Sequence, residues 1–220
     1  MKTALLYLAS SLVGYLLGSF STGVVVARLY GNVDIRNYGS GNVGMTNVMR
    51  TLGWVPSFLT LAGDALKGLL AAWLGRLIAG EIGMHFGGLF AVVGHNWPVF
   101  FRFKGGKGMS TSLGYLIISD WRIALIEFIV QVTIVLATGL MSLASIITAI
   151  LLPIITIIFW PGSVPYIVTA VILCALALYS HRENIKRLLA GRENKLNANK
   201  ITEISKKMVQ KLKDRRNKTK

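Results

Sequence analysis

The chain has 220 residues, of which 53% are hydrophobic and only 15% are charged, yet its formal net charge is +15. So many apolar residues exclude an intrinsically disordered chain. The single cysteine, Cys174, excludes a disulfide-stabilised scaffold. An ordinary soluble domain is about 25% charged, so this composition predicts a protein embedded in lipid. The charge is uneven, because residues 182–220 hold 14 of the 24 lysines and arginines and have a net charge of +10.

Apolar segments in chain order predict an all-α integral membrane protein with about seven transmembrane helices. The segments are residues 4–29, 54–78, 84–101, 109–119, 123–140, 142–160 and 164–179. A membrane crossing takes about 20 apolar residues, so the fourth segment is either a short crossing or a re-entrant helix. We expect residues 1–181 to form the transmembrane bundle and residues 182–220 to form a basic juxtamembrane tail.

Basic residues are concentrated in the loops on one side of this predicted bundle. They follow the first, third and seventh segments: Arg28, Arg36, Arg50, Arg102, Lys104, Lys107 and the tail. The opposite side carries only Lys2, Arg76 and Arg122. Because cytoplasmic loops are enriched in Lys and Arg, we expect the N-terminus outside and the C-terminus in the cytoplasm.

The basic tail shows a helical hydrophobic pattern. Ile201, Ile204, Met208 and Leu212 recur at spacings of three and four residues among lysines. This pattern predicts an amphipathic helix that lies on the anionic inner surface of the membrane. A solvated, partly disordered tail is the alternative. Because the body of the chain is apolar, the tail's charge indicates a membrane partner and no nucleic acid.

Three polar stretches fall on the predicted cytoplasmic side, and their residue types suit an anion. Residues 39–50 contain three glycines and Arg50, residues 104–108 read Lys-Gly-Gly-Lys-Gly, and residues 181–187 carry His181 and Arg182. Glycines let backbone N–H groups approach an anion, and lysines supply point charges. Positive anchor loops are the alternative for the second and third stretches. Together the stretches predict an anion site lined by Arg50, Lys104, Lys107 and Arg182 at the mouth of an apolar bundle, which suits a lipid phosphate or an acyl phosphate.

Ionisable residues also occur inside the predicted helices. Asp64 and Lys67 are three residues apart, so they share a helix face and either pair with each other or line a site. Together with Glu127 they would also suit a transporter for an anionic solute. Against a transporter, the polar motifs cluster on one side and no inverted repeat is visible. A membrane scaffold recruited through its tail is the third alternative.

Four motifs occur in order and resemble one family. They are Ser40-Gly-Asn-x-Gly-x-Thr-Asn-x-x-Arg50, Asp64-x-x-Lys67-Gly, Gly94-His-x-x-Pro98 continuing to Phe103-Lys-Gly-Gly-Lys-Gly108, and His181-Arg-Glu-Asn184. The chain resembles the PlsY-type acyl-phosphate:glycerol-3-phosphate acyltransferases over most of residues 10–196. Met45 and Ser21 depart from the family pattern, in which Ala and Pro are usual.

The resemblance implies a seven-helix enzyme of the bacterial inner membrane with its site facing the cytoplasm. It would transfer a fatty acyl group from acyl phosphate to the sn-1 hydroxyl of glycerol 3-phosphate, without cofactor or metal. An enzyme that produces acyl phosphate is a possible partner. The resemblance assigns binding of the acyl phosphate to Ser40, Arg50 and Lys107 or Lys104, and it assigns the shaping of that loop to Asn42, Thr46 and Asn47. It assigns binding of glycerol 3-phosphate to Ser142, His181, Arg182 and Asn184. His95 would support the site.

The proton acceptor and the acyl donor are the remaining chemical questions. His181 is a candidate base by its chemistry, whereas the resemblance implies that the substrate phosphate takes the proton. Acyl-CoA-dependent relatives carry an Asp five residues after a His. None of His85, His95 and His181 has one there, so we expect acyl phosphate as the donor.

Overall fold

The computed structural model describes residues 2–218, and within that range the chain is helical with no strand. Its side chains are described as far as Met208 and at Gln210. The helices are α1 (Lys2–Gly18), α2 (Thr22–Gly31), α3 (Met45–Leu52), α4 (Trp54–Asn96), α5 (Met109–Ser119), α6 (Trp121–Thr138), α7 (Met141–Phe159), α8 (Val164–Ser180), α9 (Arg182–Leu189) and α10 (Ala198–Lys218), with single 3-10 turns η1 (Ile35–Asn37) and η2 (Val99–Phe101). The all-α class is therefore confirmed.

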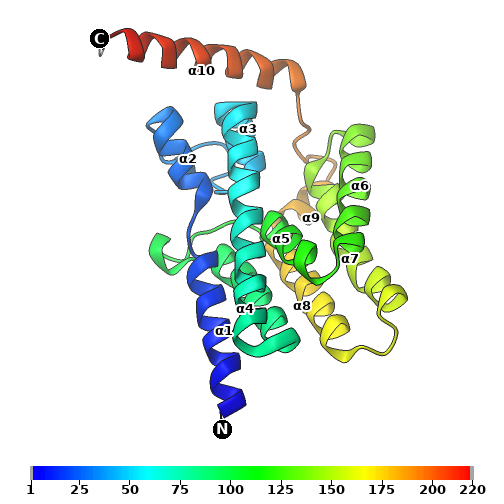
Figure 1. The fold of residues 1–220 in the computed structure, drawn as a ribbon. Coiled ribbons are helices and arrows are strands. Elements are labelled where there is room, and N and C mark those ends of the chain that lie inside the picture. Colours follow the sequence, from blue (N-terminus) through cyan, green and yellow to red (C-terminus); the bar gives the residue numbers. More distant parts are fainter. Residues whose placement is uncertain (1, 219–220) are drawn as a thin grey trace.

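Two groups of helices make up the bundle. In one group, α1 and α5 pack against α4, and in the other α7 packs between α6 and α8. Helices α2, α3 and α10 gather at one end of the bundle, whereas the N-terminus lies at the opposite end (Figure 1). This arrangement brings the polar loops that follow α2, α4 and α8 to one side.

Helix α4 is a hairpin of two helical segments. Ala79 and Gly80 have non-helical backbone angles, and the positive φ of Gly80, 64°, is one that glycine adopts without strain. The segments pack closely, because a Cβ on Gly75 would overlap the backbone of Gly83. A Cβ on Gly14 of α1 would likewise overlap the backbone of Gly87. Such small-residue contacts are typical of helix packing in lipid.

Helix ends depart from the predicted segments at two places. The first predicted segment is broken at residues 19–21, where the carbonyl of Phe20 accepts a hydrogen bond from Lys67 Nζ at 2.8 Å. A buried side chain thus satisfies backbone that leaves the helix. The third predicted segment ends early, at Asn96, because a residue before proline is disfavoured in a helix and Trp97 precedes Pro98.

Four spans of the described chain are long and apolar enough to cross a membrane: residues 2–31, 54–101, 121–138 and 141–159. A fifth appears if α8 and α9, which are bent by 62°, count as one span. The protein is therefore a multi-pass membrane protein by length and composition. Helix α5 has 11 residues, so seven crossings and the side on which each terminus lies stay predictions.

Helix α10 packs on protein through part of its apolar stripe. Ile201 is only 2% exposed, and Met208 packs against the cluster that contains Val24 and Val48. The backbone N–H of Trp54 donates to Ser205 Oγ at 3.0 Å, which ties α10 to the start of α4. This part of the predicted amphipathic helix is thus occupied by α2, α3 and α4 rather than by lipid. Leu212 lies outside the described side chains.

Candidate active site

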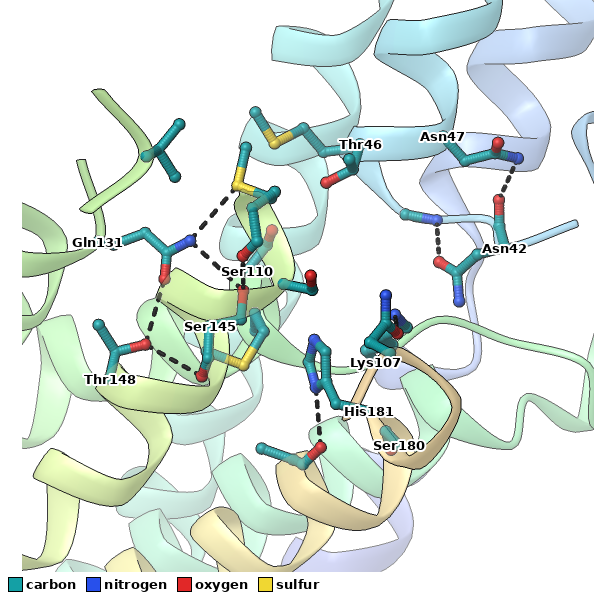
Figure 2. A pocket seen from close by; sticks show the side chains of 18 of the residues that line it. Asn42, Thr46, Asn47, Lys107, Ser110, Gln131, Ser145, Thr148, Ser180 and His181 are labelled. Atoms are coloured by element: carbon teal, nitrogen blue, oxygen red, sulfur yellow. Dashed lines mark hydrogen bonds between the residues drawn. The ribbon is translucent and has the colours of Figure 1, made fainter. Parts of the chain in front are cut away.

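A cavity of about 1090 Å³ opens between the two helix groups. Its walls come from the loop before α3, the start of α5, the facing sides of α6 and α7, the turn between α8 and α9, and residues 193–204 (Figure 2). One end is polar and cationic, and the other is an apolar arm. The arm is lined by Leu61, Leu113, Leu116, Phe128, Val132, Val135, Leu136, Leu152 and Leu173.

The loop that precedes α3 is held in shape by one amide side chain. Asn47 Nδ2 donates to the carbonyls of Tyr38 and Asn42 at 2.9 and 2.8 Å and to that of Ile35 at 3.3 Å. Its Oδ1 accepts the N–H of Ser40 at 3.0 Å. These bonds use the donors and the acceptor of an amide, so Asn47 acts by shaping the loop.

Asn42 completes the same loop from the cavity side. Its Oδ1 accepts the N–H of Gly44 at 2.8 Å, which leads the chain into α3 (Figure 2). Ser40 and Thr46 also line the cavity. The motif at residues 40–50 is therefore a preorganised turn, with its polar side chains at the cavity wall.

The glycine-rich loop after α4 places Lys107 at the polar end. The N–H of Gly106 donates to the carbonyl of His95 at 2.9 Å, and a Cβ on Gly106 would overlap the His95 ring. The loop can therefore lie flat on the end of α4 only without side chains at that point. Lys107 Nζ donates to Asn184 Oδ1. Burial lowers the pKa of Lys107 to about 8.

Arg50 reaches the same end from α3. Its Nη2 donates to the backbone carbonyl of Asn194 at 2.9 Å, while its buried Nε has no hydrogen-bond partner among the described residues. Burial lowers the pKa of the guanidinium, which stays charged because its ordinary pKa is above 12. Arg50 thus keeps a buried donor available at the cavity wall.

Glu193 is the anion among these cations. Its carboxylate accepts from Asn184 Nδ2 and from Arg187 Nε, both at 2.8 Å, and its side chain is only 4% exposed. Burial opposes its ionisation, but the hydrogen bonds from Asn184 and Arg187 outweigh burial and lower its pKa. The segment after α9 is thereby fixed as a wall of the site. Sequence reasoning missed both Arg187 and Glu193.

His181 caps α8 and lies inside the cavity wall. It is 3% exposed, and its Nδ1 lies 2.8 Å from the carbonyl of Ala177 (Figure 2). A carbonyl only accepts hydrogen bonds, so Nδ1 carries the ring proton and Nε2 of the neutral ring is left with a lone pair. Ser142, at the start of α7, lines the same region.

A buried ionic cluster lies next to the polar end of the cavity. Lys67 Nζ lies 2.9 Å from Asp64 Oδ1 and 2.8 Å from His95 Nδ1. Asp64 and His95 also line the cavity, whereas Lys67 does not; Asp64 and Lys67 therefore pair with each other, and Asp64 alone of the two borders the site. The cluster also anchors Phe20 through Lys67.

The structure brings together nearly every residue that the sequence placed in the site. The following line the cavity: Ser40, Asn42, Thr46, Asn47, Arg50, His95, Lys107, Ser142, His181, Arg182 and Asn184. Arg182 lies at the rim, where its guanidinium stacks 4.5 Å from the centre of the Tyr179 ring. Lys104 is different: it is exposed and does not line the cavity, because the loop turns only Lys107 inward. Among the described residues, no three His, Cys, Asp or Glu side chains come together as metal ligands.

Comparisons with known proteins agree with this geometry. The family described as glycerol-3-phosphate acyltransferase matches residues 8–191. Curated proteins named glycerol-3-phosphate acyltransferase are similar to this chain. The one from Thermoanaerobacter sp. (strain X514) is 41% identical over 187 residues, which cover 85% of this chain and 94% of that protein. The one from Neisseria meningitidis serogroup C is 40% identical over 189 residues, which cover 84% of this chain and 94% of that protein.

Solved structures extend the similarity to the fold. The crystal structure of PlsY (YgiH), an integral membrane glycerol 3-phosphate acyltransferase, in its glycerol 3-phosphate form is 41% identical, with a TM-score of 0.83 over 89% of this chain and 98% of that one. The lysophosphatidic acid form is 40% identical, with a TM-score of 0.80 and the same coverage. The resemblance drawn from the four motifs is confirmed, and the chain belongs to the glycerol-3-phosphate acyltransferase family.

Proposed function

We propose that the protein transfers a fatty acyl group from an acyl phosphate to the sn-1 hydroxyl of glycerol 3-phosphate, which yields lysophosphatidic acid and inorganic phosphate. The observation that carries this proposal is one cavity with a cationic end and an apolar arm. Both substrates contain a phosphate, and one also contains a hydrocarbon chain. The membership of the chain in the glycerol-3-phosphate acyltransferase family supports the acceptor and the reaction type.

The polar end binds the two phosphates. Arg50 of α3 and Lys107 of the loop after α4 both line the cavity, and Arg50 Nε and Lys107 Nζ can each donate to a phosphate oxygen. Lys107 is mostly protonated at neutral pH, because its pKa is about 8. Ser40 donates from the preorganised loop, and Ser142, Arg182 and Asn184 hold glycerol 3-phosphate.

The apolar arm holds the hydrocarbon chain of the acyl phosphate. Several of its lining side chains are also exposed at the surface, among them Phe128 at 47% and Leu136 at 81%. In a chain whose α6 is apolar and only sparsely buried, that surface faces lipid. The arm therefore opens sideways, and an acyl chain enters from the bilayer without passing through water.

Acyl phosphate is a mixed anhydride, so positioning and charge neutralisation carry most of the catalysis. The acceptor hydroxyl oxygen attacks the acyl carbon, a new C–O ester bond forms, and the bond between the acyl carbon and the phosphate oxygen breaks. Arg50 and Lys107 stabilise the negative charge that develops on the departing phosphate. The proton of the hydroxyl passes either to His181 Nε2 or to the substrate phosphate.

The cellular setting follows from the charge distribution. The loop before α3 lies toward the end of the molecule where α10 lies, and the loop after α4 lies level with the C-terminal end of α1, away from the N-terminus (Figure 1). By the positive-inside rule, the side that holds these basic loops is cytoplasmic. We propose a location in the bacterial inner membrane with the active site facing the cytoplasm. Because acyl phosphates hydrolyse readily as mixed anhydrides, we propose that an enzyme that produces acyl phosphate supplies the donor.

The decisive experiment uses detergent-purified full-length protein, a long-chain acyl phosphate and labelled glycerol 3-phosphate. We expect labelled lysophosphatidic acid and one equivalent of phosphate, and no comparable product with acyl-CoA as donor. Arg50→Ala is the inactive control, with its fold checked by thermal melting. Product formed from acyl-CoA but not from acyl phosphate would refute acyl phosphate as the donor. The absence of acylated product with either donor would refute the proposed acyl transfer.

A further inference from the structure

The apolar arm of the cavity contains hydrogen-bonding side chains that neither phosphate binding nor burial of a plain hydrocarbon chain requires. Glu127 and Gln131 lie one turn apart on α6 and line the arm, together with Ser145 and Thr148 of α7. Polar groups at membrane depth are costly, and in membrane proteins they commonly have a functional role. This patch therefore calls for an explanation from its contacts.

Gln131 is already held by its neighbours. Its Nε2 donates to Ser145 Oγ at 3.4 Å, and its Oε1 accepts from Thr148 Oγ1 at 3.1 Å (Figure 2). Ser145 Oγ donates to the carbonyl of Met141 at 3.0 Å, and the single hydroxyl hydrogen of Thr148 is shared between Gln131 Oε1 and the carbonyl of Ala144, which lies 3.0 Å from Thr148 Oγ1. The α6–α7 pair therefore presents a fixed polar surface at this depth.

Glu127, by contrast, has no partner. It is 8% exposed, it lines the cavity, and its Oε1 is buried without a hydrogen bond among the described residues. The cavity lining also includes the apolar side chains of Leu116, Leu152 and Leu173. A buried polar group without a partner is unfavourable by amounts comparable to a lost hydrogen bond. The missing partner must therefore come from what fills the cavity.

The depth of Glu127 indicates which part of a ligand reaches it. Gln131 contacts Thr148 of α7, which lies six residues, about 9 Å, beyond Ser142, and Glu127 lies about 6 Å further along α6 at about 1.5 Å per residue. Along α7, the cavity wall runs from Ser142 to Leu152, about 15 Å by the same rise. An extended hydrocarbon chain advances by about 1.3 Å per carbon, from a C–C bond of about 1.5 Å. A chain whose first carbon lies at the polar end thus passes Glu127 near its twelfth carbon, by this estimate of about 15 Å.

We propose that Glu127 and Gln131 form a polar subsite that recognises an acyl chain with a hydroxyl group in the middle of the chain. A hydroxyl both donates and accepts, so it pairs with the Glu127 carboxyl in either protonation state and with the amide one turn away. The inference rests on the proposed function, because it assigns the arm to the acyl chain of that reaction. It adds a preference among acyl donors that the reaction itself does not require.

The test compares two donors in direct competition: 12-hydroxyoctadecanoyl phosphate and octadecanoyl phosphate, with full-length purified protein. We expect the hydroxylated donor to be preferred by about 3- to 10-fold in kcat/KM, the range for one net hydrogen bond. Glu127→Gln keeps a hydrogen-bonding group and should retain the preference, whereas Glu127→Leu should reduce the ratio to 1 or below. Glu81→Leu is the matched control, because Glu81 is exposed on α4 and does not line the cavity.

The outcomes separate the subsite from the reaction. If the unmodified protein shows a ratio of 1, or if Glu127→Leu retains the full preference, the subsite is wrong. If neither donor is used at all, the proposed function fails instead. Should Glu127→Leu not fold, Glu127→Asp withdraws the carboxyl by about 1.5 Å, one C–C bond. A preference that Glu127→Asp leaves unchanged would then overturn the proposal.

Discussion

Asn47 offers the sharpest test of how the loop at residues 35–47 is organised. Asn47→Ala removes three donations to backbone carbonyls and one acceptance from the N–H of Ser40, at distances of 2.8–3.3 Å. The two amide hydrogens are shared among the three carbonyls, so Asn47 makes the equivalent of three full hydrogen bonds, and at about 0.5–1.5 kcal/mol net for each bond they stabilise this loop by about 3 kcal/mol. The loop places Ser40 and Asn42 at the cavity wall, so disorder of the loop should lower turnover.

The expected effect follows from the population of the ordered loop. A loss of about 3 kcal/mol lowers the ratio of ordered to disordered loop by about two orders of magnitude. Because the ordered loop is strongly favoured in the unmodified protein, part of this loss of free energy leaves the population of ordered loop almost unchanged. We therefore expect kcat/KM to fall by about 10- to 100-fold. Because the loop lies at one end of the bundle, the thermal midpoint should fall by only a few degrees, about 2–5 °C.

Two further variants make the test specific. Asn47→Asp keeps an oxygen that can accept from the N–H of Ser40, but it places a second carboxylate oxygen, which cannot donate, against the three carbonyl oxygens; its turnover should therefore fall at least as far as that of Asn47→Ala. Asn37→Ala is the matched control, because Asn37 is exposed in the same loop and does not line the cavity. Turnover by Asn47→Ala within twofold of the unmodified protein would refute the view that this amide organises the loop.

Other predictions concern charge, proton transfer and packing. Because the pKa of Lys107 is about 8, its positive charge is present below pH 8 and lost above it. We therefore expect kcat/KM for acyl phosphate to fall as the pH rises through 8, and Lys107→Arg should move this fall to higher pH. His181→Gln should keep measurable turnover if the substrate phosphate takes the proton, whereas a loss of kcat beyond about 10³-fold with unchanged glycerol 3-phosphate binding would assign the base to His181. Gly14→Val should lower the thermal midpoint markedly, because any Cβ at this position overlaps the backbone of Gly87; an unchanged midpoint would contradict the close α1–α4 contact.

Hydropathy alone predicted most of the helices, and its failures have local causes. The predicted segment 109–119 coincides with α5, 142–160 differs from α7 by one residue at each end, and 164–179 ends one residue before α8 does. The break at residues 19–21 was not predicted, since residues 18–23, Gly-Ser-Phe-Ser-Thr-Gly, are a short polar interruption in a longer apolar segment. What stabilises the break is Lys67, a residue 47 positions later in the chain, and no local pattern reports such a contact.

The cationic end of the site was predictable by residue type but not by position. Lys104 and Lys107 occupy equivalent places in a symmetric Gly-rich sequence, and only the path of the loop decides between them. Arg102, Phe103 and Gly108 all have positive φ values, of 57°, 57° and 83°, and these turns leave Lys104 outside the cavity while Lys107 points inward. Glu193 carried a weaker signal, as one of four acidic residues in a strongly basic tail.

The boundary between bundle and tail, placed at residue 182 from composition, passes through the site itself. Arg187 and Glu193 bind each other at the polar end of the cavity, and Ile201 and Ile204 of the next helix form part of its wall. The same α10 is tied through Ser205 to the first residue of α4. Basic residues of the tail therefore occupy two environments that composition cannot distinguish. Arg187 forms part of the cavity wall, whereas Lys206 and Lys207 are exposed. Removing the segment after residue 197 would open the cavity on the side of α3. We therefore expect this truncation to weaken substrate binding more than it weakens membrane attachment.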